Sequence, residues 1–246
     1  MSNTTIDLLN NHKSIRAFTD QPVSDDMVTT ILTAASAGPN INNYQPVTFV
    51  EITDQDLKAE ITAQVGMSYI ESAMRYFVVT VDFNKDLIGL TPDVRQQAET
   101  VLSSYAMLEG GIVSAGIALG RAQVAAESLG LGSVTMAGAL RAFELYEEKL
   151  QLPKLVKAVM GFSIGYPAQE PGIKPKLPID GIWMKEHYSQ DQMSAAVTVY
   201  DQTMVKYYAD RGIDSSWTRN NAKMLTRKQD NAKLGAYPKL KGFSLK

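Results

Sequence analysis

The sequence contains no cysteine and only two histidines, His12 and His187. Without cysteine the chain has no disulfide framework, no thiolate nucleophile, and no cysteine-ligated zinc ion or iron–sulfur cluster. Two histidines are also too few for a multi-histidine metal centre, so we expect no metal site. Thiol-dependent enzymes and enzymes with cysteine-ligated or multi-histidine metal centres are therefore excluded.

Long hydrophobic runs are also missing. The longest uncharged, largely apolar stretch is residues 110–120, which lies between Glu109 and Arg121 and is too short to span a bilayer. The first residues lack the charged start and the apolar run of a signal peptide. We expect a cytoplasmic protein with no membrane partner.

The net charge is small, but the charged residues are unevenly distributed along the sequence. The formal net charge is −2, which gives no reason to expect nucleic acid as a partner. Residues 219–246 hold eight Lys and Arg against one acidic residue, Asp230, and so carry +7. The other 218 residues carry 16 basic and 25 acidic side chains, a net −9. The chain therefore ends in a basic tail on an otherwise acidic protein.

Helical and strand patterns alternate irregularly along the chain. β-Branched and aromatic residues predict strands at residues 48–52, 76–82, 134–136 and 156–164. Apolar residues at helical spacing predict helices at residues 4–12, 24–37, 54–64, 91–128, 143–150 and 192–211. The even βαβ rhythm of a doubly wound fold is missing, so we expect an α+β domain in which helices wrap a sheet.

Small residues recur at intervals of four in the longest predicted helix. The pairs are residues 111 and 115, 116 and 120, and 118 and 122. Small residues at this spacing let two helices approach closely. The stripe therefore predicts either a helix–helix or subunit interface or an ordinary alanine-rich core helix, and the sequence does not choose between them.

Two short motifs suggest other functions, but the secondary structure predicted around each motif does not fit that function. Residues 130–132, Gly-Leu-Gly, resemble the start of a dinucleotide-binding fingerprint, but the third glycine position holds Thr135. These glycines also follow a helix and precede a strand, which reverses the order that a phosphate-binding loop needs.

The second motif, residues 161–165 (Gly-Phe-Ser-Ile-Gly), fits the nucleophile elbow of hydrolases, with Asp180 and His187 available as partners for Ser163. An elbow must turn directly into a helix, and prolines at 167 and 171 prevent one. We interpret Ser163 as a strand residue between two closely packed glycines.

Residues 12–18, His-Lys-Ser-Ile-Arg-Ala-Phe, gather cationic and hydroxyl groups in a few positions. Arginine, lysine, serine and imidazole together bind a phosphate dianion well. Ile15 and Phe18 are suited to anchor the segment in the core. By itself such a cluster is more often a solvated surface patch than a ligand site.

Six segments together resemble the signature motifs of the nitroreductase superfamily of flavoenzymes, in its branch of NADPH-dependent flavin and nitro reductases. In chain order they are residues 12–18 (HKSIRAF), 39–46 (PNINNYQP), 82–84 (DFN), 125–132 (AAESLGLG), 138–141 (GALR) and 174–178 (KPKLP). The resemblance extends from residue 8 to about residue 212. It implies a nitroreductase-like fold, with a central, mainly antiparallel sheet wrapped by helices, in an intertwined homodimer. It further implies an FMN-binding core at residues 1–190 and a C-terminal helical excursion with the basic tail at residues 191–246.

The resemblance also implies which residues bind FMN. They are His12, Lys13, Ser14, Arg16, Asn40, Asn43, Met67, Tyr69, Ala137, Gly138, Lys174 and Lys176. The first four would hold the phosphate and the ribityl chain, and Arg16 is also our candidate for electrostatic support of the reduced flavin. The two asparagines would reach the flavin of the partner chain. Met67, Tyr69, Ala137 and Gly138 would lie at the flavin ring, and the last two lysines would face the phosphate again.

Four of these positions depart from the family pattern, and one of them is Asn40, which together with Ile41 replaces a pair of serines. Lys13 and Lys176 stand where arginine is usual, and a lysine keeps the charge but loses the bidentate fork. Met67 stands where the branch usually has a glutamine against the pyrimidine edge of the flavin. That substitution removes a hydrogen bond.

The activity implied is that of an FMN-dependent oxidoreductase. It would transfer hydride from NADPH through flavin N5 to nitroaromatic, quinone, azo or flavin acceptors in a ping-pong cycle, with no catalytic side chain needed. Candidates for binding the 2′-phosphate of NADPH lie in the basic tail and are Arg219, Lys223, Arg227 and Lys228. The tail fits a solvated face, or a strap over the partner subunit, equally well. The alternative function is an FMN-binding store or sensor without rapid turnover.

Overall fold

The computed structural model describes residues 3–227 and 231–244, which form two compact units. One unit comprises residues 1–171 and 231–246, and the other comprises residues 172–230. The compact units thus divide after residue 171. The boundary expected from the sequence lies after residue 190. Residues 231–246 belong to the first unit again. The assignment of FMN binding to a core domain stays a prediction.

The first unit is built on a four-stranded antiparallel sheet with strand order β1-β2-β4-β3. The strands are β1 (Val47–Glu51), β2 (Arg75–Asp82), β3 (Gly132–Met136) and β4 (Val156–Gly165). All four predicted strands are confirmed, as is the α+β class. The two long apolar strands, β2 and β4, occupy the centre, where both faces of a strand are covered.

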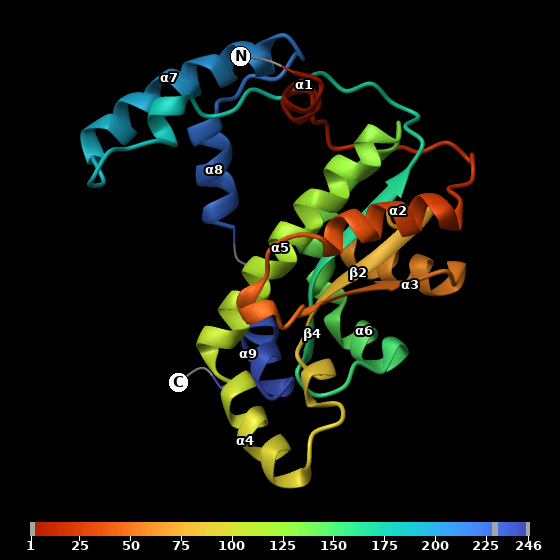
Figure 1. The fold of residues 1–246 in the computed structure, drawn as a ribbon. Coiled ribbons are helices and arrows are strands. Elements are labelled where there is room, and N and C mark those ends of the chain that lie inside the picture. Colours follow the sequence, from red (N-terminus) through yellow and green to blue (C-terminus); the bar gives the residue numbers. More distant parts are fainter. Residues whose placement is uncertain (1–2, 228–230, 245–246) are drawn as a thin grey trace. The chain divides into compact units, whose positions relative to one another are not determined.

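Side chains alternate across β2 and so divide the core in two. Phe77 and Val79 pack with α2 (Asp25–Ser36) and α5 (Tyr105–Ser128) on one face of the sheet. Tyr76 and Val78 pack on the other face, against side chains of α3 (Gln55–Val65), α6 (Phe143–Leu150) and α9 (Ala232–Leu240). Figure 1 shows α5 running along the sheet with α2 beside it. The sheet is thus sandwiched between two helical layers.

The helix predicted at residues 91–128 is two helices, α4 (Pro92–Leu102) and α5, bent by 75°. Ser104 causes the break, because its side chain accepts a hydrogen bond from the backbone N–H of Met107 and so caps a new helix. Among the described residues, no single helix is long and apolar enough to cross a membrane. The bent pair α4–α5 passes that test on length and composition alone.

The stripe of small residues on α5 serves two different surfaces. A Cβ on Gly111 would lie 2.7 Å from Cγ1 of Val81, and Ala122 is fully buried, so this part of the stripe is core packing. A Cβ on Gly116 or Gly120 would meet nothing within 4 Å. These two glycines instead line an open groove together with apolar side chains of α1 (Thr4–Asn10), α2 and α5. A subunit interface stays a prediction for this second part.

Residues 231–244 pack into the first unit and complete its core. The Tyr237 ring centroid lies 4.4 Å from that of Phe143, and only 1% of Tyr237 is exposed. Its hydroxyl donates to Glu147 at 2.6 Å and accepts from the backbone N–H of Ala158 at 3.1 Å. Phe243 packs edge-on against Phe83. This part of the basic tail is therefore packed on the first unit through Tyr237 and Phe243, while Lys233 and Lys239 are exposed on its outer side.

The second unit is a small helical body. It contains η4 (Ile179–Gly181), α7 (Gln190–Ala209) and α8 (Trp217–Leu225), of which the sequence predicted α7. The rings of Tyr200 and Trp217 meet at 5.5 Å, and Asp201 accepts from the backbone N–H of Thr218 at 2.7 Å. The Tyr200 hydroxyl donates to the Pro175 carbonyl at 2.9 Å, which fixes the extended segment before α7.

The remaining short elements position loops of the first unit. They are α1 (Thr4–Asn10), η1 (Ile41–Asn43), η2 (Lys85–Leu87) and η3 (Ala137–Ala142).

Burial of the Lys157 ammonium group makes stability depend on pH. The group donates to the Ala158 carbonyl at 2.9 Å and lies 4.7 Å from the Tyr237 ring centroid. Burial lowers the pKa of Lys157 from 10.5 to about 8, against a smaller opposing effect of Glu147. The unfolded chain therefore binds this proton more tightly than the folded chain. The free energy of unfolding must rise as the pH increases from about 8 to about 10.5.

We expect Lys157→Met to raise the free energy of unfolding near neutral pH by about 1 to 3 kcal/mol, because no charge is then buried. The variant should also lose the gain in stability between pH 8 and 10.5 that wild type shows. Urea unfolding at several pH values measures both effects, with the exposed Lys239→Met as control. Parallel pH curves for wild type and Lys157→Met would contradict the prediction.

Candidate functional site

The cationic segment 12–16 lies along the free edge of β3. The backbone N–H of Ile15 donates to the Ser133 carbonyl at 2.9 Å, and Ser14 and Ser133 form a parallel bridge. Ile15 is buried, and a Cβ on Gly132 would lie 2.6 Å from its Cγ1, so the two backbones approach as closely as glycine allows. The predicted anchoring of this segment by Ile15 is confirmed.

Two side chains of the segment, His12 and Lys13, contact carboxylates. Nδ1 of His12 lies 2.6 Å from Oε1 of Glu127, near the end of α5. The Lys13 ammonium group forms an ion pair with Glu170. Neither glutamate was assigned a role from the sequence. Glu127 does lie within the AAESLGLG motif, which was the available signal, whereas nothing around Glu170 marks it.

Arg16 has no ion-pair partner within residues 3–227 and 231–244 and is exposed. Its guanidinium carbon lies 5.9 Å from the ring centroid of Tyr69, within the range of a cation–π contact. The carbonyl of Tyr69 accepts a hydrogen bond from Ser163 at 3.1 Å. The structure therefore brings the cationic segment to one of the predicted ring-contacting residues.

The loop after α3 and the turn η3 form one surface next to this contact. Arg141 joins them, because its Nη2 donates to the Val65 carbonyl at 2.8 Å and its Nε donates to the Gly138 carbonyl at 3.3 Å. The methyl group of Met67 lies where a Cβ on Gly138 would be, so Met67 packs directly on this glycine. Ala137 is exposed beside it. Met67, Tyr69, Ala137 and Gly138 are thus neighbouring positions, as a shared role requires.

Asn40 and Asn43 belong to a different part of the first unit. They border a cavity of about 470 Å³ between the end of α2, α5 and η2. The chain there takes left-handed backbone conformations at Asn42, Asn43 and Gln45, with φ of 50°, 57° and 51°. Within the described ranges, no hydrogen bond or ion pair joins these asparagines to segment 12–16.

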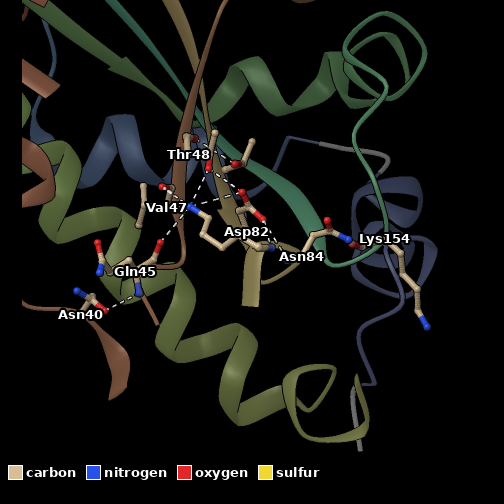
Figure 2. A network of polar contacts seen from close by, with 9 residues as sticks. Asn40, Gln45, Val47, Thr48, Asp82, Asn84 and Lys154 are labelled. Atoms are coloured by element: carbon tan, nitrogen blue, oxygen red, sulfur yellow. Dashed lines mark hydrogen bonds and ion pairs between the residues drawn. The ribbon is translucent and has the colours of Figure 1, made fainter. Parts of the chain in front are cut away.

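Asp82 of the DFN motif and Lys85, which follows the motif, fix this asparagine loop to the sheet. The Lys85 ammonium group donates to the carbonyls of Gln45 and Val47, each at 3.1 Å, and to the Thr48 hydroxyl at 3.0 Å. Asp82 accepts from the same Thr48 hydroxyl at 2.7 Å (Figure 2). The network continues to the asparagine loop, where Oδ1 of Asn40 accepts a hydrogen bond from the backbone N–H of Gln45 at 2.8 Å. Lys85, next to the DFN motif, is therefore the structural link between Asp82 and the asparagine loop.

Lys174 and Lys176 lie in the second unit, exposed on the extended segment that Tyr200 holds. Of the candidates for NADPH, Arg219 is paired with Asp214 at 2.8 Å, and this pairing raises the pKa of Arg219. Lys223 and Arg227 are exposed, and Lys228 lies outside the described residues. The roles of all six stay predictions.

The structure argues against the hydrolase interpretation, because Ser163, its candidate nucleophile, is not accessible to a substrate. Ser163 is fully buried in β4 and gives its hydroxyl hydrogen bond to Tyr69. A Cβ on Gly161 would lie 2.8 Å from the Tyr76 hydroxyl, and one on Gly165 would lie 2.9 Å from the Phe18 ring. The interpretation of Ser163 as a strand residue between closely packed glycines is confirmed.

The comparisons with known proteins agree with this arrangement. The model of the nitroreductase family matches residues 9–166, and that of the nitroreductase family C-terminal domain matches residues 174–246. An FMN reductase [NAD(P)H] of Bacillus subtilis is 37% identical over 89% of this chain and 88% of its own length. An oxygen-insensitive NADPH nitroreductase of Salmonella typhimurium is 34% identical over 85% of this chain and 84% of its own.

Solved structures show the same fold. A hypothetical oxidoreductase of Bacillus subtilis superposes with a TM-score of 0.92 at 31% identity, and each chain is covered completely, at 100%. The NADPH:FMN oxidoreductase of Vibrio harveyi, solved in complex with NAD+, superposes with a TM-score of 0.82 at 28% identity over 98% of this chain and 99% of its own. On its sequence motifs, its fold and these likenesses, the chain belongs to the nitroreductase family.

Proposed function

We propose that this protein is an FMN-dependent oxidoreductase that takes electrons from NADPH and reduces small oxidised acceptors, of which nitroaromatics, quinones, azo compounds and free flavin are the candidates. The names of the relatives, FMN reductase and NADPH nitroreductase, support the cofactor, the donor and the reaction class. The observation that carries the proposal is the contact of Arg16, in the cationic segment 12–16, with the ring of Tyr69, on the loop that Arg141 ties to the turn of Ala137 and Gly138.

The donor set of segment 12–16 fits the phosphate group of FMN. A phosphate dianion needs several cationic or hydroxyl donors that are not already committed to carboxylates. Arg16 is such a cation within the described chain, and Ser14 adds a hydroxyl group beside it. Anchoring by Ile15 fixes the backbone of the segment, so these donors need little ordering when the phosphate binds.

The surface next to Tyr69 fits the flat ring of a flavin. Ala137 and Gly138 present almost no side chain, and Arg141 ties their turn to the loop that carries Met67 and Tyr69. Bound FMN would supply the redox chemistry, in which it accepts hydride from NADPH and passes the electrons on to the acceptor in a second half-reaction. The protein's part would be to hold the flavin phosphate through segment 12–16 and to hold the ring next to Tyr69 and Ala137.

We further propose that the functional protein is a homodimer in which Asn40 and Asn43 reach the flavin of the partner chain. Two observations support this. The two asparagines have no polar link to segment 12–16 within the described part of their own chain. The outer face of α5 also leaves apolar side chains exposed, and Gly116 and Gly120 line an open apolar groove there. Such a groove suits a close approach between helices.

The purified protein should be yellow, elute with the mass of two chains, and lose its flavin absorbance when NADPH is added without oxygen. An absorbance spectrum, light scattering and anaerobic titration measure the three properties. A yellow protein that NADPH does not bleach would favour a flavin store or sensor. A colourless protein that takes up no added FMN would overturn the proposal.

Arg16→Ala should weaken FMN binding about tenfold to a hundredfold, since loss of a charge-assisted contact to phosphate costs about 1.5 to 3 kcal/mol. Riboflavin, which lacks the phosphate, should bind to the variant and to wild type alike. Quenching of flavin fluorescence gives both dissociation constants. The control is Arg95→Ala, at a surface ion pair with Glu99 on α4. Full retention of FMN by Arg16→Ala would remove Arg16 from the site.

Candidates for the 2′-phosphate of NADPH are best tested by point substitution, because deleting the tail would remove Tyr237 and Phe243 from the core. We expect Lys223→Gln with Arg227→Gln to lower the preference for NADPH over NADH about tenfold, as expected for about 1.4 kcal/mol of lost attraction. Steady-state kinetics with both donors measure this. Lys239→Gln, an exposed lysine of the same tail, is the control. An unchanged preference would exclude both residues.

A further inference from the structure

Two neighbouring cations of segment 12–16 are held by glutamates in very different surroundings. Glu127, the partner of His12, is a fixed residue of α5 with only 13% of its side chain exposed. Glu170, the partner of Lys13, follows the sheet in an irregular segment and is 77% exposed. The two glutamates carry the same charge but differ strongly in burial, and this difference indicates that they have different roles.

Glu127 is part of a connected polar network. Its Oε1 accepts from Ser133 Oγ at 3.3 Å, and Ser133 Oγ in turn accepts from Nε2 of Gln123 at 3.3 Å. Ser133 is fully buried, and its carbonyl accepts a hydrogen bond from the backbone N–H of Ile15 in the cationic segment. The carboxylate that contacts His12 is thus held by the same strand residue that anchors the segment.

A carboxylate at Nδ1 determines how an imidazole ring is used. The short contact of 2.6 Å places the Nδ1 proton between His12 and Glu127 and fixes the rotation of the ring. Nε2, on the opposite side of the ring, is then left as the nitrogen that can meet a ligand. With a proton on each nitrogen the ring is a cation that donates in two directions, to Glu127 and to an anion.

We propose that Glu127 is a positioning residue for the phosphate of the flavin: it holds the His12 ring so that Nε2 donates to a phosphate oxygen. Glu170, by contrast, is an exchangeable counter-ion that Lys13 exchanges for the phosphate. This inference rests on the proposed function, because it takes FMN as the ligand of segment 12–16.

The direction of the change in FMN affinity distinguishes a positioning role from a purely electrostatic one. Glu127 and Glu170 each place a negative charge near the site of a dianion, so by Coulomb attraction alone the removal of either should tighten FMN binding. If Glu127 positions His12, its removal weakens binding instead. The same substitution at two glutamates then gives opposite results.

The test compares Glu127→Gln with the matched variant Glu170→Gln, and measures the dissociation constants of FMN and of riboflavin by quenching of flavin fluorescence. We expect Glu127→Gln to weaken FMN binding about tenfold and to leave riboflavin binding unchanged. Glu170→Gln should bind FMN as tightly as wild type or more tightly. Tighter FMN binding by Glu127→Gln, or an equal loss for FMN and riboflavin, would overturn the proposal.

Glu127→Asp keeps the charge and shortens the reach, and it serves as the second variant if Glu127→Gln does not fold. Positioning predicts that it too weakens FMN binding selectively, whereas FMN binding equal to wild type would overturn the proposal. A double-mutant cycle adds a direct readout, because Glu127→Gln should have no further weakening effect once His12 is replaced by Asn. Failure of wild type itself to bind FMN would be a separate result, against the proposed function.

Discussion

The burial of β2 and β4 on both faces is the constraint on which the first unit depends. Their side chains are apolar in both directions, so neither face of the sheet can be left to water. One face is covered by α2 and α5, and the other by α3, α6 and α9 (Figure 1). Only β1 and β3 are left as edges, and the free edge of β3 is where segment 12–16 is bound. The candidate site is thus built on an edge strand whose other side is fixed by the core.

The charges of the candidate site are balanced locally. His12 and Lys13 each have a glutamate, whereas Arg16 has an aromatic ring and no carboxylate within the described chain. An anion at this segment would therefore find Arg16 unpaired within the described chain, and His12 and Lys13 each beside a carboxylate. Under the proposed roles Lys13 would release the exposed Glu170, whereas the buried Glu127 would stay in contact with His12.

Much of this fold was predictable from local pattern. β-Branched runs marked all four strands, and Ser24 and Pro92 marked helix starts, because these signals act over a few residues. The break at Ser104 was missed because the residues on both sides of it have strong helical patterns. Helix α9 was missed because Gly235 and Pro238 weaken its local pattern, while its stability comes from Tyr237 and the distant Phe143.

The candidate site was predictable only in part, for the same reason. Segment 12–16, Tyr69 and Gly138 came from motifs, which record positions but not contacts. The pairing of His12 with Glu127 joins residues 115 positions apart, and the link from Arg141 to Val65 joins residues 76 apart. Such pairs depend on how β3 and η3 are placed against the sheet, and no short stretch of sequence contains that information.

The return of residues 231–244 to the first unit has a consequence for how the protein is made. A ribosome completes residues 1–171 and then the whole of the second unit before it reaches Tyr237 and Phe243, which fill the core of the first. Until then the surface beneath α9, including Phe143 and Glu147, lacks its cover. In sequence, the second unit is thus an insertion within the first, and the sheet sandwich is completed by a segment that is synthesised after that insertion.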